Sequence, residues 1–469
     1  MRQVLTRRLA KAAVICAALV AAPLAAQAES LAGALANAYR NSGLLEQNRA
    51  VLRAADEDVA TAVSLLRPVV DFTTSVGRSY SDTRSTAAVI TTGTSTLSLS
   101  VTLSLLVFDN GVARFSQQAA KETVLATRAA LLGVEQDVLL RAVAAYMNVI
   151  RETQNVALRE NNVRVITQEL RAAQDRFEVG EVTRTDVALA ESRLAEARAN
   201  LAAAQGNLLN QQEEYLAAVG RRPGTLSPPP GLPTPPESIE AAKAVALRNH
   251  PSVVQLQHAV AAAELAVLRA EAGMGPTVRL NGSLGVTDNL GNTATTNSSS
   301  LSLVLNQRIY QGGALASGLR KAMAQRDSSR AQLMTVQEAV AQAASNAFVR
   351  LEVARATIEA TDRRIAAAQV AFRGVREEAA LGARTTLVVL DAEQELLDAQ
   401  GARISAQAEL YVAAYQLLSA QGLLSAERLG LGVQVYDPTA YYNMVKDAPA
   451  HRSERGRKLD RVLRSLNKD

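Results

Sequence analysis

The chain contains one long pattern twice, and this duplication constrains its fold more than any other feature. One copy contains the segment Leu-Leu-Arg-Pro68-Val-Val-Asp-Phe-Thr-Thr-Ser-Val-Gly. Roughly 200 residues later the chain has a similar segment, Ala-Gly-Met-Gly-Pro276-Thr-Val-Arg-Leu-Asn-Gly-Ser-Leu-Gly. Phe177-Glu-Val-Gly180 is answered in the same way by Ala380-Leu-Gly382. A duplication of this length predicts one supersecondary unit used twice. In each copy, short segments of alternating polarity are inserted between very long helical segments.

The duplication divides the chain into five parts. We predict a signal peptide at 1–28, a first structural repeat at 29–222 and a Pro-rich connector at 223–236. A second structural repeat follows at 237–430, and a tail at 431–469 is predicted to be disordered. Each repeat is expected to run helix, two strands, long helix, helix.

The first 28 residues have the make-up of an export signal. A basic stretch from Arg2 to Lys11 precedes the apolar run 12–22, and Ala26-Gln27-Ala28 provides small residues for cleavage. A retained membrane anchor is the alternative, but the apolar run is short for a bilayer span. The only cysteine, Cys16, lies inside this segment, so the mature chain is expected to lack both disulfides and thiol chemistry.

The charge distribution argues against a nucleic-acid partner. The formal net charge of +5 comes from the basic leader and from the tail after Lys446, which leaves the body slightly acidic. A nucleic-acid surface needs basic residues clustered on the folded part. The chain also has no Trp and only 3% aromatic residues, so stacking platforms for bases are not expected.

The segments of alternating polarity are typical of membrane-spanning β-strands. Between Leu97 and Leu105 every odd position is apolar and every even position is Ser or Thr. Similar alternation occurs at 69–77, 278–287 and 301–309, with a polar turn expected at 81–96. One apolar and one hydroxylated face suits lipid outside and a polar lumen inside; a soluble hairpin covering a core is the alternative. Four strands cannot close a barrel, and open edges in lipid leave backbone groups unpaired, so several chains are expected to contribute to one barrel.

The helical segments are unusually long. No proline interrupts 112–178, which predicts a helix of about 100 Å. Helices at 31–66 and from 186 to 219 are each about half that length and are expected to stack end to end beside it. Residues at heptad spacing predict antiparallel coiled-coil packing in both repeats: Val187, Leu194, Leu201, Leu208 and Tyr215 with Ala190, Ala197 and Ala204, and then Leu390, Leu397, Ile404, Tyr411 and Leu418.

No catalytic, cofactor-binding or metal-binding site is predicted. The sequence has no phosphate-binding loop, no nucleophile elbow and no paired His and carboxylate spacing. The features that stand out are two turns between helices, one in each repeat, which we call the apices. Gly180 and Gly382 suit the C-terminal caps of the helices entering them, and Thr185 or Asp186 suits the N-cap of the helix leaving the first.

At these residues the chain resembles the TolC family of outer-membrane efflux and secretion channels. The resemblance covers roughly 29–430 and is carried by Phe177-x-Val-Gly180 with Thr185-Asp186, Gly382-x-Arg384-Thr385 with Val389-Leu390-Asp391, Val107-Phe-Asp109 and Ile309-Tyr-Gln-Gly-Gly313. It implies an α+β membrane protein of trimeric form, with four β-strands per protomer in a shared outer-membrane β-barrel. Long coiled-coil helices would form a periplasmic α-barrel, and most of the chain would lie in the periplasm.

The resemblance also implies a function and partners. The chain would be a channel, not an enzyme, serving as the exit duct of a tripartite efflux or type I secretion system. Its partners would be two further copies in a homotrimer, a periplasmic adaptor (membrane fusion) protein, outer-membrane lipid, and an inner-membrane proton-driven or ABC transporter.

Residue by residue, the resemblance places a periplasmic gate at Thr185, Asp186, Arg384, Val388 and Asp391. Arg384 would reach Thr185 and Asp186 of a neighbouring hairpin, and Asp391 would contribute a ring of carboxylates. Two positions depart from the family pattern, since Val388 stands in place of a second pore Asp and Ala379 in place of a latch Tyr. Contacts with the adaptor would fall on the tips of the apices: Val179, Gly180, Glu181, Leu381, Gly382 and Ala383.

Three other classes of protein compete with the channel. A trimeric coiled-coil surface or adhesion protein with a β-barrel anchor usually has its barrel at one terminus, whereas here strands lie in both repeats. A periplasmic adaptor would need a β-rich lipoyl-like region, which we do not find. An exported enzyme would need catalytic residues.

Overall fold

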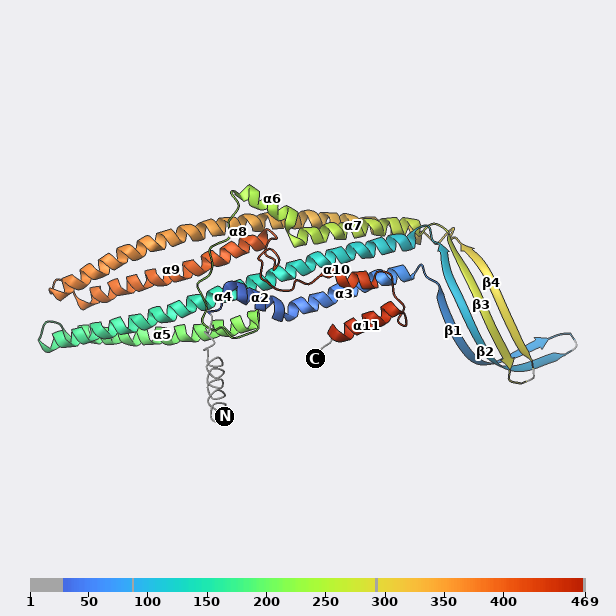
Figure 1. The fold of residues 1–469 in the computed structure, drawn as a ribbon, viewed down its shortest axis with the longest axis horizontal. Coiled ribbons are helices and arrows are strands. Elements are labelled where there is room, and N and C mark those ends of the chain that lie inside the picture. Colours follow the sequence, from blue (N-terminus) through green and yellow to red (C-terminus); the bar gives the residue numbers. More distant parts are fainter. Residues whose placement is uncertain (1–27, 87, 292–293, 467–469) are drawn as a thin grey trace, which may run out of the picture. The chain divides into compact units, whose positions relative to one another are not determined.

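The computed structural model describes residues 28–86, 88–291 and 294–466, so the predicted signal peptide lies almost wholly outside the described residues. The two repeats have the same order of elements (Figure 1). The first comprises α2 (Leu31–Asn41), α3 (Gly43–Ser64), β1 (Val69–Arg84), β2 (Val89–Phe108), α4 (Val112–Glu178) and α5 (Arg184–Val219). The second comprises α6 (Ile239–Asn249), α7 (Pro251–Ala272), β3 (Thr277–Asn289), β4 (Thr295–Asn306), α8 (Ala314–Ala380) and α9 (Thr386–Ala420).

Matching helices of the two repeats have nearly equal lengths. Both α2 and α6 have 11 residues, both α3 and α7 have 22, and both α4 and α8 have 67. The long helices that the sequence predicts are present in both halves of the chain, with equal lengths. At 1.5 Å per residue, α4 and α8 are each about 100 Å long.

The single helix expected at 31–66 is instead two helices, α2 and α3. Ser42 between them is extended, with φ −71° and ψ 109°, and its hydroxyl accepts a hydrogen bond from the backbone N–H of Leu45 at 3.3 Å. Ser42 therefore caps the start of α3, because a serine oxygen can satisfy one of the amides that a helix leaves unpaired there. The second repeat breaks at the same place, where Pro251 occupies the first turn of α7.

The four strands form one antiparallel sheet in the order β1-β2-β3-β4. The strands are longer than predicted, because most of the turn expected at 81–96 belongs to β1 or β2. That stretch is rich in threonine, and β-branched residues favour extended backbone. Among the described strands, β1 and β4 each pair with one neighbour only, so the sheet has two open edges.

The pairing register separates apolar from hydroxylated side chains. Phe72 pairs with Val101, which pairs with Leu284, so these three side chains share one face. On the other face hydroxyls contact one another, with Ser98 and Thr287 3.1 Å apart and Ser283 and Ser300 2.8 Å apart. Phe72 is 70% exposed and Leu301 75% exposed, so the apolar face lacks a core beneath it.

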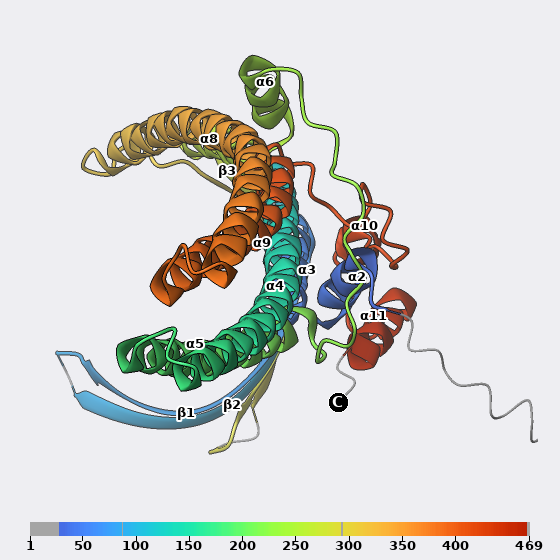
Figure 2. The same cartoon turned by 90° about the vertical axis from the view of Figure 1, so that its left-hand side faces the viewer.

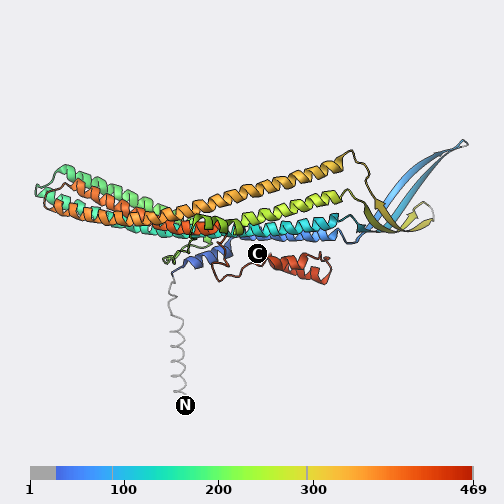
Figure 3. The ribbon, with the colours of Figure 1, turned by 90° about the horizontal axis from the view of Figure 1, so that it is seen from above.

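By compactness the described chain falls into two units, each with segments of both repeats. The first unit contains the chain up to Leu45 together with 135–246 and 342–435, and the second contains 46–134, 247–341 and the chain from Tyr436 onward. The helical hairpins of the first unit point toward the viewer in Figure 2. Figure 3 shows the helices of the second unit running to the ends of its strands.

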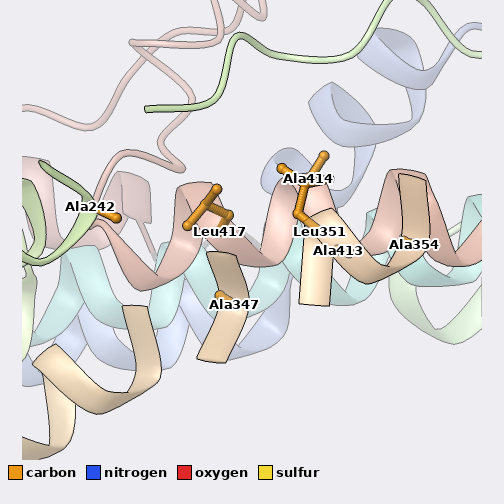
Figure 4. Close-up of a cluster of buried hydrophobic side chains, with 7 residues drawn as sticks. All are labelled: Ala242, Ala347, Leu351, Ala354, Ala413, Ala414 and Leu417. Carbon is orange, nitrogen blue, oxygen red and sulfur yellow. The ribbon is translucent and has the colours of Figure 1, made fainter. Parts of the chain in front are cut away.

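The first unit is held together by small and branched apolar residues. Figure 4 shows one cluster, in which α6, α8 and α9 pack through Ala242, Ala347, Leu351, Ala354, Ala413, Ala414 and Leu417. A second cluster joins α4, α5 and α9 and includes Ala190, Leu194, Ala197 and Leu390 from the predicted heptad rows. Alanine at these positions lets helix backbones approach closely.

The end-to-end stacking of short helices is also seen in the first unit. The side-chain amide of Asn41, at the end of α2, donates to the carbonyl of Val219 at the end of α5. Connector residues 223–236 form neither helix nor strand, apart from a bridge between Leu226 and Glu29. The Tyr146 hydroxyl of α4 fastens this bridge by contacting the carbonyls of Glu29 and Ser227 at 2.8 and 2.7 Å.

The tail, predicted to be disordered, contains two helices, α10 (Pro438–Val445) and α11 (Glu454–Leu466). The tail folds because the apolar side chains that lie between its charged residues pack against another part of the chain. Tyr441, Val445 and Leu459 of the tail are buried in one cluster with Ala60 of α3. Within the described residues, no helix has the length and hydropathy of a membrane span.

Candidate functional site

The first apex joins α4 to α5 through a left-handed glycine. Gly180 has φ +82°, and its N–H donates to the carbonyl of Phe177 at 3.0 Å. The next amide, of Glu181, donates to the carbonyl of Arg176 at 2.9 Å. A side chain is strained at such a φ, which explains the glycine here.

The helix leaving the first apex begins with a reciprocal cap. The Thr183 hydroxyl accepts from the N–H of Asp186, and a carboxylate oxygen of Asp186 accepts from the backbone N–H of Thr183 at 2.9 Å. The N-cap is therefore Thr183, and the prediction of Thr185 or Asp186 at that position was wrong. Asp186 is the third residue of the helix, where it completes the capping box. Hydrogen bonds from the Thr183 hydroxyl and then from its N–H lower the pKa of Asp186.

The second apex has the same backbone geometry but a different cap. Gly382 has φ +75°, and the amides of Gly382 and Ala383 donate to the carbonyls of Ala379 and Glu378 at 3.1 and 2.9 Å. Thr385 occupies the N-cap of α9 without a side-chain hydrogen bond to the helix. The two apices thus share a fold and differ in how firmly the outgoing helix is capped.

Both apices line one polar surface groove of about 440 Å³ in the first unit. The groove brings three of the predicted gate residues together, Asp186, Arg384 and Val388. It also contains three of the predicted adaptor contacts, Glu181, Gly382 and Ala383. Thr185 and Asp391 are exposed outside it. Val179 and Leu381 project at the tips, 71% and 86% exposed, so both tips present an apolar side chain to solvent.

Arg384 makes an ion pair within its own hairpin. Its Nε lies 2.7 Å from a carboxylate oxygen of Glu378, and both side chains are about half exposed. The predicted link to Thr185 and Asp186 concerns a neighbouring chain and stays a prediction. An exposed pair of this kind contributes little to stability, so the guanidinium can exchange partners at low cost.

Asp391 is held by a residue that the sequence reasoning missed. Arg193 of α5 lies 3.1 Å from its carboxylate and also contacts Glu196 at 3.3 Å. Charge patterning could not identify Arg193, since its partner Asp391 belongs to the other repeat. The pair ties the predicted pore carboxylate to the other helical hairpin.

Buried polar residues that were not predicted from the sequence lie on α4 and α9. Glu393, two residues beyond Asp391, is 6% exposed and accepts a hydrogen bond from the amide of Asn162 at 2.6 Å. Burial raises the pKa of Glu393, the hydrogen bond from Asn162 opposes the shift, and nearby Glu169 adds to it. Glu169 pairs with Arg376 of α8 at 3.2 Å. The sequence did contain a signal, because Glu393 falls between Leu390 and Leu397 on an otherwise apolar stripe.

In the part of the chain that the structure describes, no group of three or more His, Cys, Asp or Glu side chains could hold a metal ion.

Comparison with known proteins accounts for this architecture. The family model described as "Outer membrane efflux protein" matches residues 34–221 and 244–423, which includes both apices and all four strands. The chain belongs to the outer membrane efflux protein family. The predicted resemblance is thereby confirmed, as is the outer-membrane location with a large periplasmic portion.

Individual relatives agree with the family assignment. The chain is 38% identical over 443 residues to the outer membrane efflux protein BepC of Brucella suis, covering 94% of this chain and 96% of that protein. It is 24% identical over 311 residues to the outer membrane protein TolC of Escherichia coli, covering 63% of each. The solved CmeC outer membrane channel of Campylobacter jejuni has the same fold, with a TM-score of 0.76, 16% identity and 90% coverage of both chains.

The family assignment settles the class of protein. Outer membrane efflux proteins are ducts, not an enzyme family, and the present chain serves as an exit duct through the outer membrane. Its strands supply part of the barrel and its long helices part of the periplasmic tunnel.

Proposed function

We propose that three copies of the chain form one duct that receives substrates from a periplasmic adaptor and an inner-membrane pump. The pump would be a proton-driven transporter of an efflux system or an ABC transporter of a type I secretion system. The observation that supports this most directly is the four-stranded sheet, with two open edges and an apolar face exposed over its length.

Closure of the sheet requires neighbours. Each unpaired backbone group in lipid costs several kcal/mol, so a sheet with open edges is not stable in the membrane. Two chains of four strands would make an eight-stranded barrel, whose interior is just wide enough for its own side chains. Three chains give a barrel with room for a lumen, and its inner face would carry the hydroxyl contacts between Ser98, Thr287, Ser283 and Ser300.

The periplasmic gate would lie where apices of neighbouring chains converge. We propose that Arg384 leaves Glu378 for Thr185 and Asp186 of the next chain, so that a polar link closes the end of the tunnel. Asp391, steadied by Arg193, would form a ring of carboxylates, and Val388 an apolar ring beside it. The exposed tips at Val179–Glu181 and Leu381–Ala383 would then remain open to the adaptor.

The gate can be tested by conductance of the purified protein in planar lipid bilayers. Wild-type protein should form long-lived channels of low conductance, and Arg384→Ala should raise the conductance because the polar link is lost. The matched control is Arg364→Ala, since Arg364 forms a similar half-exposed pair with Glu395 at 2.7 Å on α8 and α9, away from the apex.

The outcomes separate the gate from the duct. An unchanged conductance in Arg384→Ala would remove Arg384 from the gate but leave the duct intact. An equal rise in Arg364→Ala would show that loosening any helix pair opens the channel. Absence of conductance in the wild-type protein would contradict the duct itself.

A further inference from the structure

The C-terminal tail is fastened beside the point where the chain enters the barrel. The guanidinium of Arg67 donates hydrogen bonds to the backbone carbonyls of Asp447 and Ala448, between α10 and α11. Arg67 lies two residues before β1 begins at Val69. The ends of the strands that continue into helices face the periplasm in an outer-membrane duct. The turn that precedes α11 therefore lies at the periplasmic foot of the barrel.

The apolar side of α11 is turned toward the protein. Leu459 is buried against Ala60 of α3 and against Tyr441 and Val445 of α10, and Leu463 packs against the same cluster. Figures 1 and 3 show α11 running beside α3. The opposite side of the helix consequently faces away from the core.

The outward side of α11 is strongly basic. Arg457, Arg461 and Arg464 are exposed, and their spacing of four and three residues places them on one face of a helix. Together with Lys458 they line a surface hollow that also contains Glu454 and Asp460. Both acidic residues of the hollow already have partners, Glu454 pairing with Lys458 inside it at 2.9 Å and Asp460 with His451 at 3.3 Å. Within the described ranges, no ion pair involves the side chains of Arg457, Arg461 or Arg464.

We propose that this basic face of α11 binds the phosphate groups of anionic phospholipids in the periplasmic leaflet of the outer membrane. A planar guanidinium matches the geometry of a phosphate and can donate two hydrogen bonds to it. Basic clusters beside a membrane-spanning segment are attracted to anionic lipid, and the attraction acts over roughly 8 Å at physiological ionic strength. The anchoring at Arg67 places the turn before α11 beside the start of β1, at the periplasmic foot of the barrel, which favours lipid over an anionic polymer deeper in the periplasm.

The proposal is tested with the full mature chain in nanodiscs, by hydrogen exchange of the amides of 454–466. We compare discs of phosphatidylcholine alone with discs containing phosphatidylglycerol. Exchange in α11 should slow by about fivefold or more in the anionic discs at low salt, and this protection should disappear at high salt because the attraction is screened. The double substitution Arg457→Glu with Arg461→Glu should abolish the protection, and Arg457→Gln with Arg461→Gln should reduce it.

The matched control is Arg171→Glu with Arg198→Glu, which reverses two exposed charges on α4 and α5 and should leave the lipid-dependent protection unchanged. Equal exchange in both kinds of disc, or protection that survives the α11 charge reversal, would overturn the proposal. Protection produced by soluble peptidoglycan fragments and absent with phosphatidylglycerol would also overturn it and identify the polymer as the partner. Single-channel conductance of the α11 variants in neutral bilayers should equal that of the wild type, so this test is separate from that of the duct.

Discussion

Asp56 of α3 is the least expected residue of the second unit. Its side chain is fully buried, and within the described structure neither carboxylate oxygen has a hydrogen-bond partner. Burial raises the pKa of Asp56 to about 6, Arg128 opposes the shift, and neighbouring Glu57 adds to it. A buried carboxylate without partners favours its protonated form, so α3 contains a group that weakens the fold when it ionises.

We predict that Asp56→Asn stabilises the protein at high pH. Because the native pKa exceeds the ordinary value of 3.8 for an aspartate, the native state between these two pH values holds a proton that the unfolded chain has already released. Stability therefore falls as the pH rises from about 4 to about 6, and the loss above that range is at most about 3 kcal/mol per chain at 1.4 kcal/mol per pKa unit. The melting temperature of Asp56→Asn, followed by helical circular dichroism, should exceed the wild-type value at pH 8 and match it at pH 4.

The control for this prediction is Asp58→Asn, which removes an exposed carboxylate from the same helix. It should shift the melting temperature equally at both pH values. A gain for Asp56→Asn that is as large at pH 4 as at pH 8 would contradict the titration argument and point to packing instead.

At the scale of single elements, the two apices offer a matched comparison. Thr183 caps α5 through a reciprocal pair of hydrogen bonds, whereas Thr385 stands at the same position of α9 without one. Removing an N-cap hydroxyl costs about 1 kcal/mol where its hydrogen bond exists. Thr183→Ala should therefore loosen the first turn of α5 by about that amount, and Thr385→Ala should change α9 much less.

Hydrogen exchange measures this difference. In Thr183→Ala, the amides of 185–188 should exchange about fivefold faster than in the wild type, which corresponds to about 1 kcal/mol. Amides 387–390 in Thr385→Ala should keep nearly wild-type rates. Equal acceleration at both apices would mean that the hydroxyls act through something other than the cap.

Elements with a clear sequence period could be predicted, and those decided by local hydrogen bonds could not. Long helices without proline and strands with alternating Ser and Leu were found, because periodicity alone specifies them. The break at Ser42 was missed, since one serine hydroxyl decides it. The cap at Thr183 was assigned to its neighbours for the same reason. The folded tail was missed because the surface that orders it, around Ala60 of α3, is nearly 400 residues away in the chain.

The contacts that the site residues make with other helices could not be predicted from the sequence either. Glu393 and Asp56 fall on buried stripes that the helical period reveals, so their burial could be foreseen. The contacts of Arg193 with Asp391 and of Asn162 with Glu393 join helices of different repeats. Such contacts depend on how the hairpins pack, which one sequence does not specify.

At the scale of the whole molecule, the sheet implies how copies of the chain meet. The four strands alternate in direction, so β1 and β4 run opposite to one another. The β4 edge of one chain can then join the β1 edge of the next as another antiparallel pair, and the ring closes with no change of strand direction. An odd number of strands would instead force a parallel pair at each junction.

This closure predicts a disulfide between chains. The only cysteine lies at position 16, in the predicted signal peptide, so introduced cysteines should have no competitor in the mature protein. We combine Phe72→Cys on β1 with single cysteines at successive positions of β4 from Asn297 to Leu303, since the register across the junction is not specified by one chain. Facing residues of an antiparallel pair have Cα atoms about 4.5–5.5 Å apart, within the roughly 4.4–6.8 Å that a disulfide spans. One or two positions should therefore give a covalent trimer on oxidation, seen on denaturing gels and lost on reduction.

The central strand supplies the control. In the control, Val101→Cys on β2 takes the place of Phe72→Cys and is combined with the same single cysteines on β4. Val101 pairs with Phe72 within its own chain and lies one strand away from the edge, so no disulfide between chains should form. Trimers that form with Val101→Cys, or with every β4 position alike, would indicate random collision instead of a fixed edge. Dimers that never extend to trimers would mean that the ring closes with two chains, and the barrel would then be too narrow to leave a lumen.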